Sequence, residues 1–74
     1  MKFGSEFEAI NFEMDGAVAV ITLNRPDNAN SLNAQMSEEL LKAATHCDSD
    51  SSIRAVVFTG AGKMFSAGGD LPAF

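Results

Sequence analysis

Two apolar runs separated by one amphipathic segment constrain the fold of this chain more than any other feature of its sequence. Residues 17–23 (AVAVITL) and 53–59 (IRAVVFT) are rich in β-branched side chains, which is typical of buried strands. Between them, apolar side chains recur at helical spacing and predict the core face of one helix: Met36, Leu40, Ala43, Ala44 and Cys47. Strand, helix and strand in this order predict a right-handed βαβ crossover with parallel strands.

A β-hairpin is predicted before this crossover. Residues 9–14 alternate apolar and polar side chains, which is the period of a half-buried strand. Asp15-Gly16 follows and is a strong hairpin signal, so we expect a hairpin over residues 8–23. The predicted fold is therefore an α/β unit of ββαβ order. Its sheet has three strands, two of them antiparallel and one added in parallel.

The ends and the polar side of the helix follow from its capping and charged residues. Asn33 is a favoured N-cap after the loop at residues 24–31, and residues 48–52 end the helix. The solvent side is predicted to consist of Glu38, Glu39, Lys42 and Thr45. Glu38 and Lys42 are spaced for an ion pair one turn apart. His46, near the helix C-terminus, is expected to have a surface role rather than a catalytic one.

One face of the predicted sheet has no cover within this chain. A single helix covers one face, yet both apolar runs carry apolar side chains on both sides. An apolar face of this kind indicates contact with more protein. We therefore expect self-association, or pairing with a missing remainder of the fold.

Charge and composition argue against several kinds of partner. A net charge of −5 and a pI near 4.5 disfavour nucleic acids and anionic membranes. The single cysteine, Cys47, is most simply a small hydrophobic residue, and one histidine beside it does not make a metal site. No apolar run has the length of a bilayer and no secretory segment is present, so a cytoplasmic location is expected.

The first seven residues are expected to lie outside the domain. Residues 4–7 (GSEF) are what two common restriction sites encode in frame, which indicates a cloning-derived tag or a disordered N-terminus at residues 1–7. We therefore predict one partial domain over residues 8–74.

The small-residue turn at residues 65–71 (FSAGGDL) is the strongest candidate for chemistry. Glycines let a ligand approach the backbone, and unpaired N–H groups at a helix opening can hold an oxygen with developing negative charge. Asp70 is interpreted as the N-cap of the next turn rather than as an acid–base catalyst. Residues 60–65 (GAGKMF) begin like a dinucleotide-binding fingerprint, but Phe65 replaces the third glycine, which disfavours a Rossmann fragment.

Three blocks of the sequence, in order, resemble the crotonase superfamily, the enoyl-CoA hydratase/isomerase family. Residues 21–26 (ITLNRP) are similar to the family's strand and N-R-P loop. Residues 30–40 (NSLNAQMSEEL) are similar to its N-A-L-N…M…E-L helix opening, with Ser31 in place of the more usual alanine. Residues 55–60 (AVVFTG) and 65–71 match its V-V-[LF]-T-G…F-[SC]-A-G-x-D-[LI] block.

The resemblance implies the N-terminal piece of a crotonase (ClpP-like) spiral fold that acts on acyl-CoA thioesters in fatty acid metabolism. It implies that the backbone N–H of Gly69 donates to the thioester carbonyl as half of an oxyanion hole. The implied CoA-binding residues are Ala29, Ser31, Ala67, Gly68, Gly69, Asp70 and Leu71. Coenzyme A would be part of the substrate, and no further cofactor or metal is implied.

The chain also departs from the family pattern. The family's second oxyanion donor and its catalytic acids lie farther along the chain than Phe74. We therefore expect this chain alone to be inactive, with the acyl group and the reaction left undetermined. The alternative is a non-catalytic, stand-alone CoA-binding or interaction module.

Overall fold

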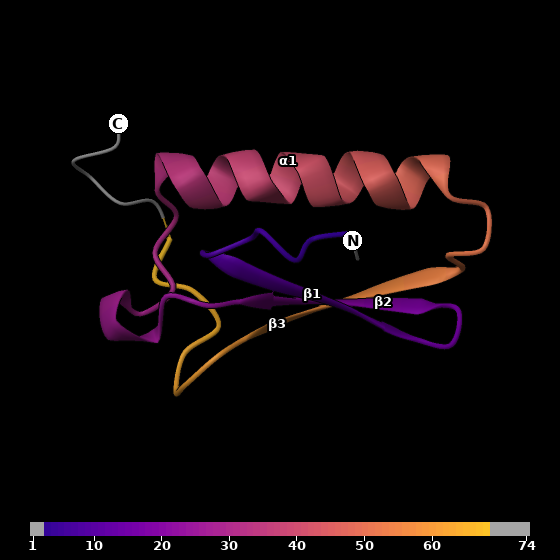
Figure 1. The fold of residues 1–74 in the computed structure, drawn as a ribbon. Helices are drawn as coiled ribbons and strands as arrows, with labels where there is room; N and C mark the ends of the chain where they lie inside the picture. Colours follow the sequence, from indigo (N-terminus) through magenta and orange to yellow (C-terminus); the bar gives the residue numbers. More distant parts are fainter. Residues whose placement is uncertain (1–2, 69–74) are drawn as a thin grey trace.

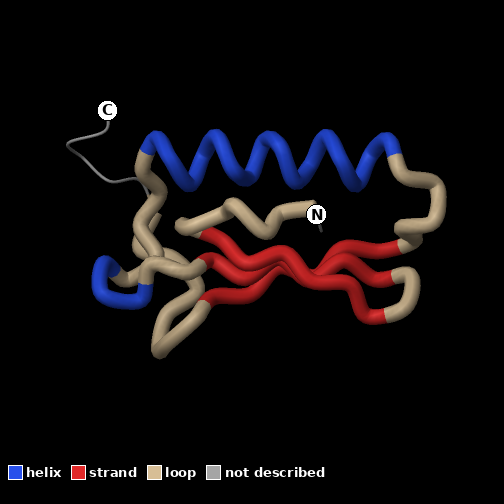
Figure 2. The backbone as a smooth tube through the Cα atoms, viewed as in Figure 1, coloured by secondary structure: helices blue, strands red, loops and turns tan. Residues whose placement is uncertain are grey.

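The computed structural model describes residues 3–68, and these form one helix packed on one face of a small sheet (Figures 1 and 2). The elements in chain order are β1 (Ile10–Asp15), β2 (Val18–Leu23), the short 3-10 helix η1 (Pro26–Asn28), α1 (Ala34–Ser49) and β3 (Ala55–Gly60). This is the ββαβ order predicted from the sequence.

The sheet has the order β1-β2-β3, with β2 in the centre. β1 and β2 are antiparallel with Ile10 opposite Leu23, which confirms the predicted hairpin. β2 and β3 are parallel and in register from Val18 opposite Ala55 to Leu23 opposite Gly60, which confirms the predicted βαβ arrangement. Parallel strands in register end at the same edge of the sheet, so the loops that follow β2 and β3 start side by side.

The predicted helix start is also confirmed. The Oδ1 atom of Asn33 accepts a hydrogen bond of 2.9 Å from the backbone N–H of Met36, so Asn33 caps α1. At the other end, the backbone N–H of Asp50 donates to the carbonyl of His46. On the solvent side, Lys42 Nζ lies 3.7 Å from Glu38 Oε1, which is the predicted pair.

The core lies between α1 and the hairpin. Its buried members are Ala9, Ile10, Ile21, Leu23, Met36 and Ala43, with Phe7, Phe12, Leu32 and Leu40 packed around them. Along β2, buried and half-buried residues alternate, so this strand is covered on one face only. The reason is that α1 lies over one face while the opposite face has no layer from residues 3–68.

β3 was expected to be a buried strand, and this expectation is wrong. Val56, Val57 and Phe58 are 40%, 47% and 53% exposed. β3 is at the edge of the sheet, whereas α1 packs against β1 and β2. Ala44, which was expected in the core, is exposed for the same reason, because it lines an open cleft between α1 and β3.

Glu39 was expected on the solvent side of the helix, and this expectation is also wrong, because its side chain is only 7% exposed. Its carboxylate accepts hydrogen bonds from the backbone N–H groups of Glu8, Ala9 and Ile10 at 3.0, 2.8 and 3.1 Å. The side chain of Gln35 also donates to it, at 3.2 Å. Glu39 is three residues after the buried Met36, and its carboxylate reaches the start of β1, where these N–H groups need an acceptor.

The aromatic residues near the N-terminus pack against the end of α1. The ring of Phe3 stacks on His46 with centroids 3.8 Å apart, and Phe12 meets both rings edge-on. His46 is half-buried there, with its Nε2 atom 3.8 Å from a carboxylate oxygen of Asp50.

Candidate functional site

Two loops meet at the edge of the sheet where β2 and β3 end (Figure 1). The first runs from Asn24 to Asn33 and contains η1, and the second follows Gly60 and is described as far as Gly68. Together they hold four of the residues expected to line the CoA site.

The first loop is shaped by two residues with left-handed backbone conformation. Ala29 and Asn30 have φ angles of 53° and 54°. Asparagine tolerates this region better than most residues, because its short polar side chain can bond locally. The guanidinium of Arg25 then closes the loop by donating to the carbonyl of Ser31 and, at 3.2 Å, to its Oγ atom.

The side chain of Asn30 is completely buried and joins both loops. Its Oδ1 atom accepts from the backbone N–H of Arg25 at 2.8 Å. Its Nδ2 group donates to the carbonyls of Ala61 at 2.8 Å and Met64 at 2.7 Å. Sequence reasoning missed this role, because the loop contains several asparagines and nothing in their spacing shows which one is buried.

The second loop runs alongside the first and is bonded to it through the backbone. The N–H of Ala67 donates to the carbonyl of Ala29 at 2.9 Å, and the N–H of Leu32 donates to the carbonyl of Gly68 at 2.7 Å. The Oγ atom of Ser66 donates to the carbonyl of Asn30 at 2.8 Å and accepts from the N–H of Gly68 at 3.1 Å. Segments far apart in the sequence therefore form one surface.

Two glycines give the second loop its shape. A Cβ atom on Gly60 would lie 2.5 Å from the carbonyl oxygen of Phe65, so the chain can fold back over the end of β3 only with glycine there. Gly68 has a φ of 96°, a conformation that a side chain would strain.

The structure thus brings Ala29, Ser31, Ala67 and Gly68 into one cluster, and their role in binding CoA stays a prediction. The other predicted site residues, Gly69, Asp70 and Leu71, lie outside the described residues. The oxyanion role of Gly69 and the capping role of Asp70 therefore stay predictions.

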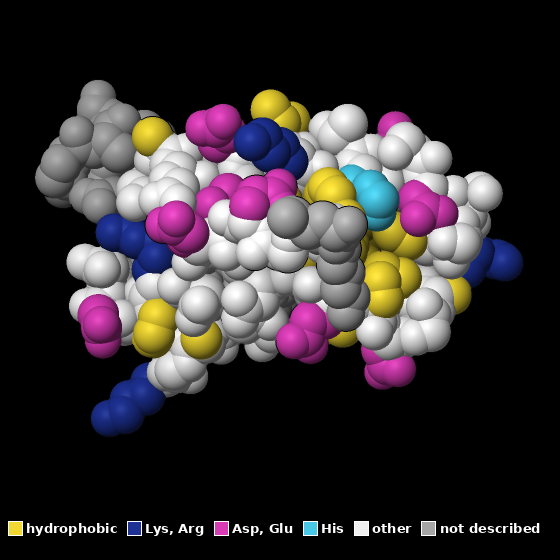
Figure 3. All heavy atoms as spheres, in the orientation of Figure 1, with side chains coloured by type: hydrophobic (Ala, Val, Ile, Leu, Met, Phe, Trp, Pro, Cys, Tyr) yellow, Lys and Arg dark blue, Asp and Glu magenta, His cyan; other side chains and the backbone are white. Residues whose placement is uncertain are grey.

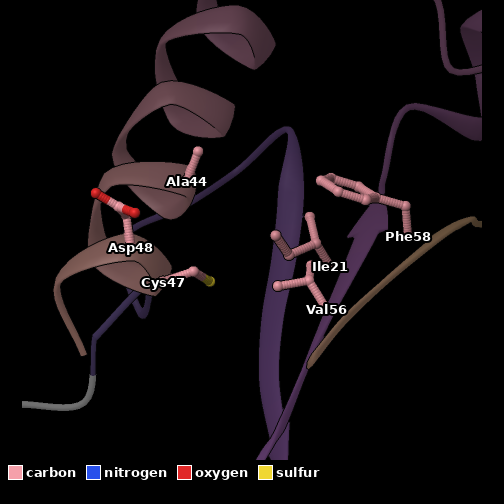
Figure 4. A pocket seen from close by; sticks show the side chains of 6 residues that line it. All are labelled: Ile21, Ala44, Cys47, Asp48, Val56 and Phe58. Atoms are coloured by element: carbon pink, nitrogen blue, oxygen red, sulfur yellow. The ribbon is translucent and has the colours of Figure 1, made fainter. Parts of the chain in front are cut away.

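A separate apolar cleft of about 320 Å³ lies between α1 and β3 (Figure 4). It is lined by Ile21, Ala44, Cys47, Asp48, Val56 and Phe58. Apolar side chains also gather on the molecular surface beside the single histidine, below the second half of α1 (Figure 3). The cleft has the character of an uncovered core rather than of a reactive site.

The charges near the cleft agree with this view. Burial raises the pKa of the Cys47 thiol, and the carboxylate of Asp50 raises it further. A raised pKa keeps the thiol protonated, which is the opposite of an activated nucleophile. The hydroxyl and backbone N–H of Ser52 hold the pKa of Asp50 below its usual value, because both donate to its carboxylate.

Within residues 3–68, no three His, Cys, Asp or Glu side chains lie together as metal ligands would. The helix in this part of the chain lacks the length and apolar character needed to cross a membrane.

Residues 13–74 match the family described as enoyl-CoA hydratase/isomerase. A probable enoyl-CoA hydratase of Mycobacterium bovis is 46% identical over 65 residues, which are 88% of this chain and 25% of that protein. A trans-2-decenoyl-[acyl-carrier-protein] isomerase of Streptococcus mutans is 39% identical over 66 residues, which are 89% of this chain and 25% of that protein.

The fold is similar to that of solved members of the same group. A probable enoyl-CoA hydratase/isomerase from Mycobacterium abscessus superposes with a TM-score of 0.88 at 40% identity, over 92% of this chain and 26% of the solved one. The chain therefore spans about a quarter of the length of the proteins that it matches.

Proposed function

This chain belongs to the enoyl-CoA hydratase/isomerase family, and from that premise we propose that it contributes one wall of an acyl thioester site. That wall would consist of the paired loops that hold Ala29, Ser31, Ala67 and Gly68. We further propose that the backbone N–H of Gly69 donates to the thioester carbonyl, as one half of an oxyanion hole.

The observation that supports this proposal most strongly is the backbone pairing of the two loops. The bonds from Ala67 to Ala29 and from Leu32 to Gly68 fix the second loop up to the residue before Gly69. Catalysis of enolate or oxyanion formation needs dipoles that are already in place, and losing one such donor typically lowers the rate by about 10²–10³. Donation from a backbone amide needs no particular side chain. A small residue at this position therefore loses nothing in chemistry and lets the thioester approach the backbone closely.

The described residues offer no candidate acid or base near the paired loops. His46 and Cys47 lie at the other end of the βαβ unit, and Asp70, which lies outside the described residues, is predicted to be a cap. We therefore propose that this chain binds a thioester but does not turn it over, because the general acid and base of the family would come from chain beyond Phe74.

Amide shifts in a titration with coenzyme A and with crotonyl-CoA test the binding proposal. The expected result is a set of shifts confined to the loops, at Ala29, Ser31, Ala67 and Gly68, with β1 unaffected. Shifts that centre on the apolar cleft, or none at all, would contradict it. Crotonyl-pantetheine, which lacks the nucleotide, distinguishes recognition of the thioester arm, which carrier-protein substrates share, from recognition of the nucleotide.

Turnover of crotonyl-CoA by pure, mass-verified protein tests the second half of the proposal. We expect no hydration above the rate in buffer. A measurable rate that rises in proportion to protein concentration would show that the chain carries its own acid and base.

We also propose that the open side of the sheet associates with a second copy or with the remainder of the family fold. The supporting observations are the half-buried side chains of β2 that face away from α1 and the exposed side chain of Val57 on β3.

A further inference from the structure

We propose that Asn30 is a positioning residue of this site, which fixes the second loop through its buried amide without touching the ligand. The consequence for the ligand rests on the proposed thioester function, whereas the positioning itself does not.

The first argument is that every polar group of the Asn30 side chain is used. Both hydrogens of Nδ2 are directed at carbonyls of the second loop, Ala61 and Met64, and Oδ1 accepts from the first loop at Arg25. The side chain is 0% exposed, so water does not compete for these bonds. A donor pair and an acceptor on one short side chain are a property of asparagine that aspartate lacks.

The second argument comes from the backbone of Asn30. Its φ is 54°, and its carbonyl accepts a hydrogen bond of 2.8 Å from the hydroxyl of Ser66. The same hydroxyl accepts from the N–H of Gly68 at 3.1 Å. Asn30 thus holds the second loop at Ala61 and Met64 by its side chain and at Ser66 by its backbone.

The contacts of Asn30 at Ala61, Met64 and Ser66 hold the part of the second loop that leads to Gly69, the predicted oxyanion donor. Hydrogen-bond donors at a reacting carbonyl work only when they are held in the correct place, and small displacements remove much of their effect. Asn30 is buried, so its effect on a bound thioester would be exerted through the position of the backbone at residues 66–68, which precede Gly69.

Two variants of Asn30 separate the effect of its side-chain hydrogen bonds from the effect of its backbone conformation. Asn30→Gly keeps a residue suited to positive φ but removes all three side-chain bonds. Asn30→Asp keeps the acceptor for Arg25 but places a carboxylate against the carbonyls of Ala61 and Met64. Asn28→Gly and Asn28→Asp are matched controls, because Asn28 belongs to the same loop and is exposed.

Hydrogen exchange gives a readout that needs no ligand. The N–H groups of Ala67 and Leu32 bridge the loops, and the central strand β2 reports the core. Relative to β2, we expect exchange of Ala67 and Leu32 to be faster by on the order of tenfold in both Asn30 variants, and unchanged in both Asn28 variants. Asn30→Gly with wild-type exchange at Ala67 and Leu32 would overturn the inference. If Asn30→Asp does not fold, Asn30→Gly alone decides.

The infrared band of the thioester carbonyl, observed with ¹³C-labelled crotonyl-CoA, gives the functional readout. In the wild-type chain, we expect hydrogen bonding to the carbonyl to shift this band to lower frequency. We expect Asn30→Gly to lose that shift while it still binds coenzyme A, and retention of the full shift would overturn the functional half of the inference. A wild-type chain with no band shift would contradict the proposed oxyanion role, and exchange at Ala67 would still decide whether Asn30 positions the loop.

Discussion

Asn30 and Glu39 are buried polar residues that connect parts of the chain distant in sequence. Asn30 joins the two loops at one edge of the sheet, and the carboxylate of Glu39 ties α1 to the start of β1. Neither side chain leaves a buried polar atom without a partner within the described residues. Such side chains specify one arrangement of the elements, because any other arrangement would leave them unpaired in the interior.

Replacing Glu39 by alanine is expected to destabilise the fold strongly. The backbone N–H groups of Ala9 and Ile10 would lose their acceptor, at a cost of roughly 1–3 kcal/mol for each buried group left unsatisfied. Urea denaturation followed by circular dichroism measures this free energy of unfolding. The control is Glu38→Ala, because Glu38 is 68% exposed in its ion pair with Lys42 and such surface pairs contribute only about 0–1 kcal/mol. Equal midpoints for the two variants would show that the Glu39 contacts contribute nothing.

The thiol of Cys47 is expected to titrate above its ordinary range. Burial raises its pKa first, and the carboxylate of Asp50 second. Thiolate absorbance should therefore give a higher pKa for the folded chain than for the urea-unfolded chain, and Asp50→Asn should remove only the smaller part of the difference. Because the folded pKa is the higher one, this contribution to stability is complete below the unfolded pKa and is lost as the pH rises through the folded pKa. Cys47→Ala should abolish that alkaline loss, and an unchanged alkaline loss in this variant would contradict the assignment.

At the scale of the elements, local sequence signals determine where each strand and helix begins and ends. The predicted hairpin and the Asn33 cap appear in the structure as expected, although the turn residues are Gly16 and Ala17, because Asp15 still pairs with Val18. These signals depend on neighbours in the chain, which the sequence displays directly. The predictions that were wrong concern the burial of side chains instead. Whether β3 and Glu39 are covered depends on where α1 lies above the sheet, and the helical period alone does not determine that position.

The cap at Asn33 offers a direct test at this scale. Asn33→Ala removes the acceptor for the N–H of Met36 and is expected to cost about 0.5–2 kcal/mol of stability. Asn33→Asp keeps an acceptor and adds a charge that is favourable at a helix N-terminus, so its stability should equal or exceed that of the wild type. Both are measured by urea denaturation. A midpoint for Asn33→Ala that equals the wild-type midpoint would contradict the role of the cap.

At the scale of the whole molecule, the single helix α1 does not cover all of the apolar surface of the sheet. The face of β2 away from α1 carries half-buried valines, and β3 exposes apolar side chains on both of its faces. The sequence predicted this uncovered surface, because a single helix cannot cover two apolar faces. It could not predict the clustering of the loop residues in the site, which depends on the buried amide of Asn30.

Association through this open surface is expected to depend on Val57. Val57 is opposite Val20 on the face away from α1 and is 47% exposed. If a second copy covers this face, sedimentation velocity should show association that grows with concentration, and Val57→Lys should weaken it by about tenfold or more. Leu41→Lys is the control, because Leu41 is 68% exposed on α1. A monodisperse wild-type monomer at high concentration, or an equal effect of the two variants, would contradict the proposal.

The bond from Ser66 to the carbonyl of Asn30 also has a consequence for the order of folding. It joins residues that are 36 positions apart. The hairpin needs only neighbouring residues and can form early, whereas this bond needs the helix to be in place and β3 to be paired beside β2. A partly folded chain therefore lacks the paired loops that would bind a thioester. A thioester that binds only the finished fold would raise the unfolding midpoint with its concentration, and would thereby report the fraction of molecules in which the crossover has closed.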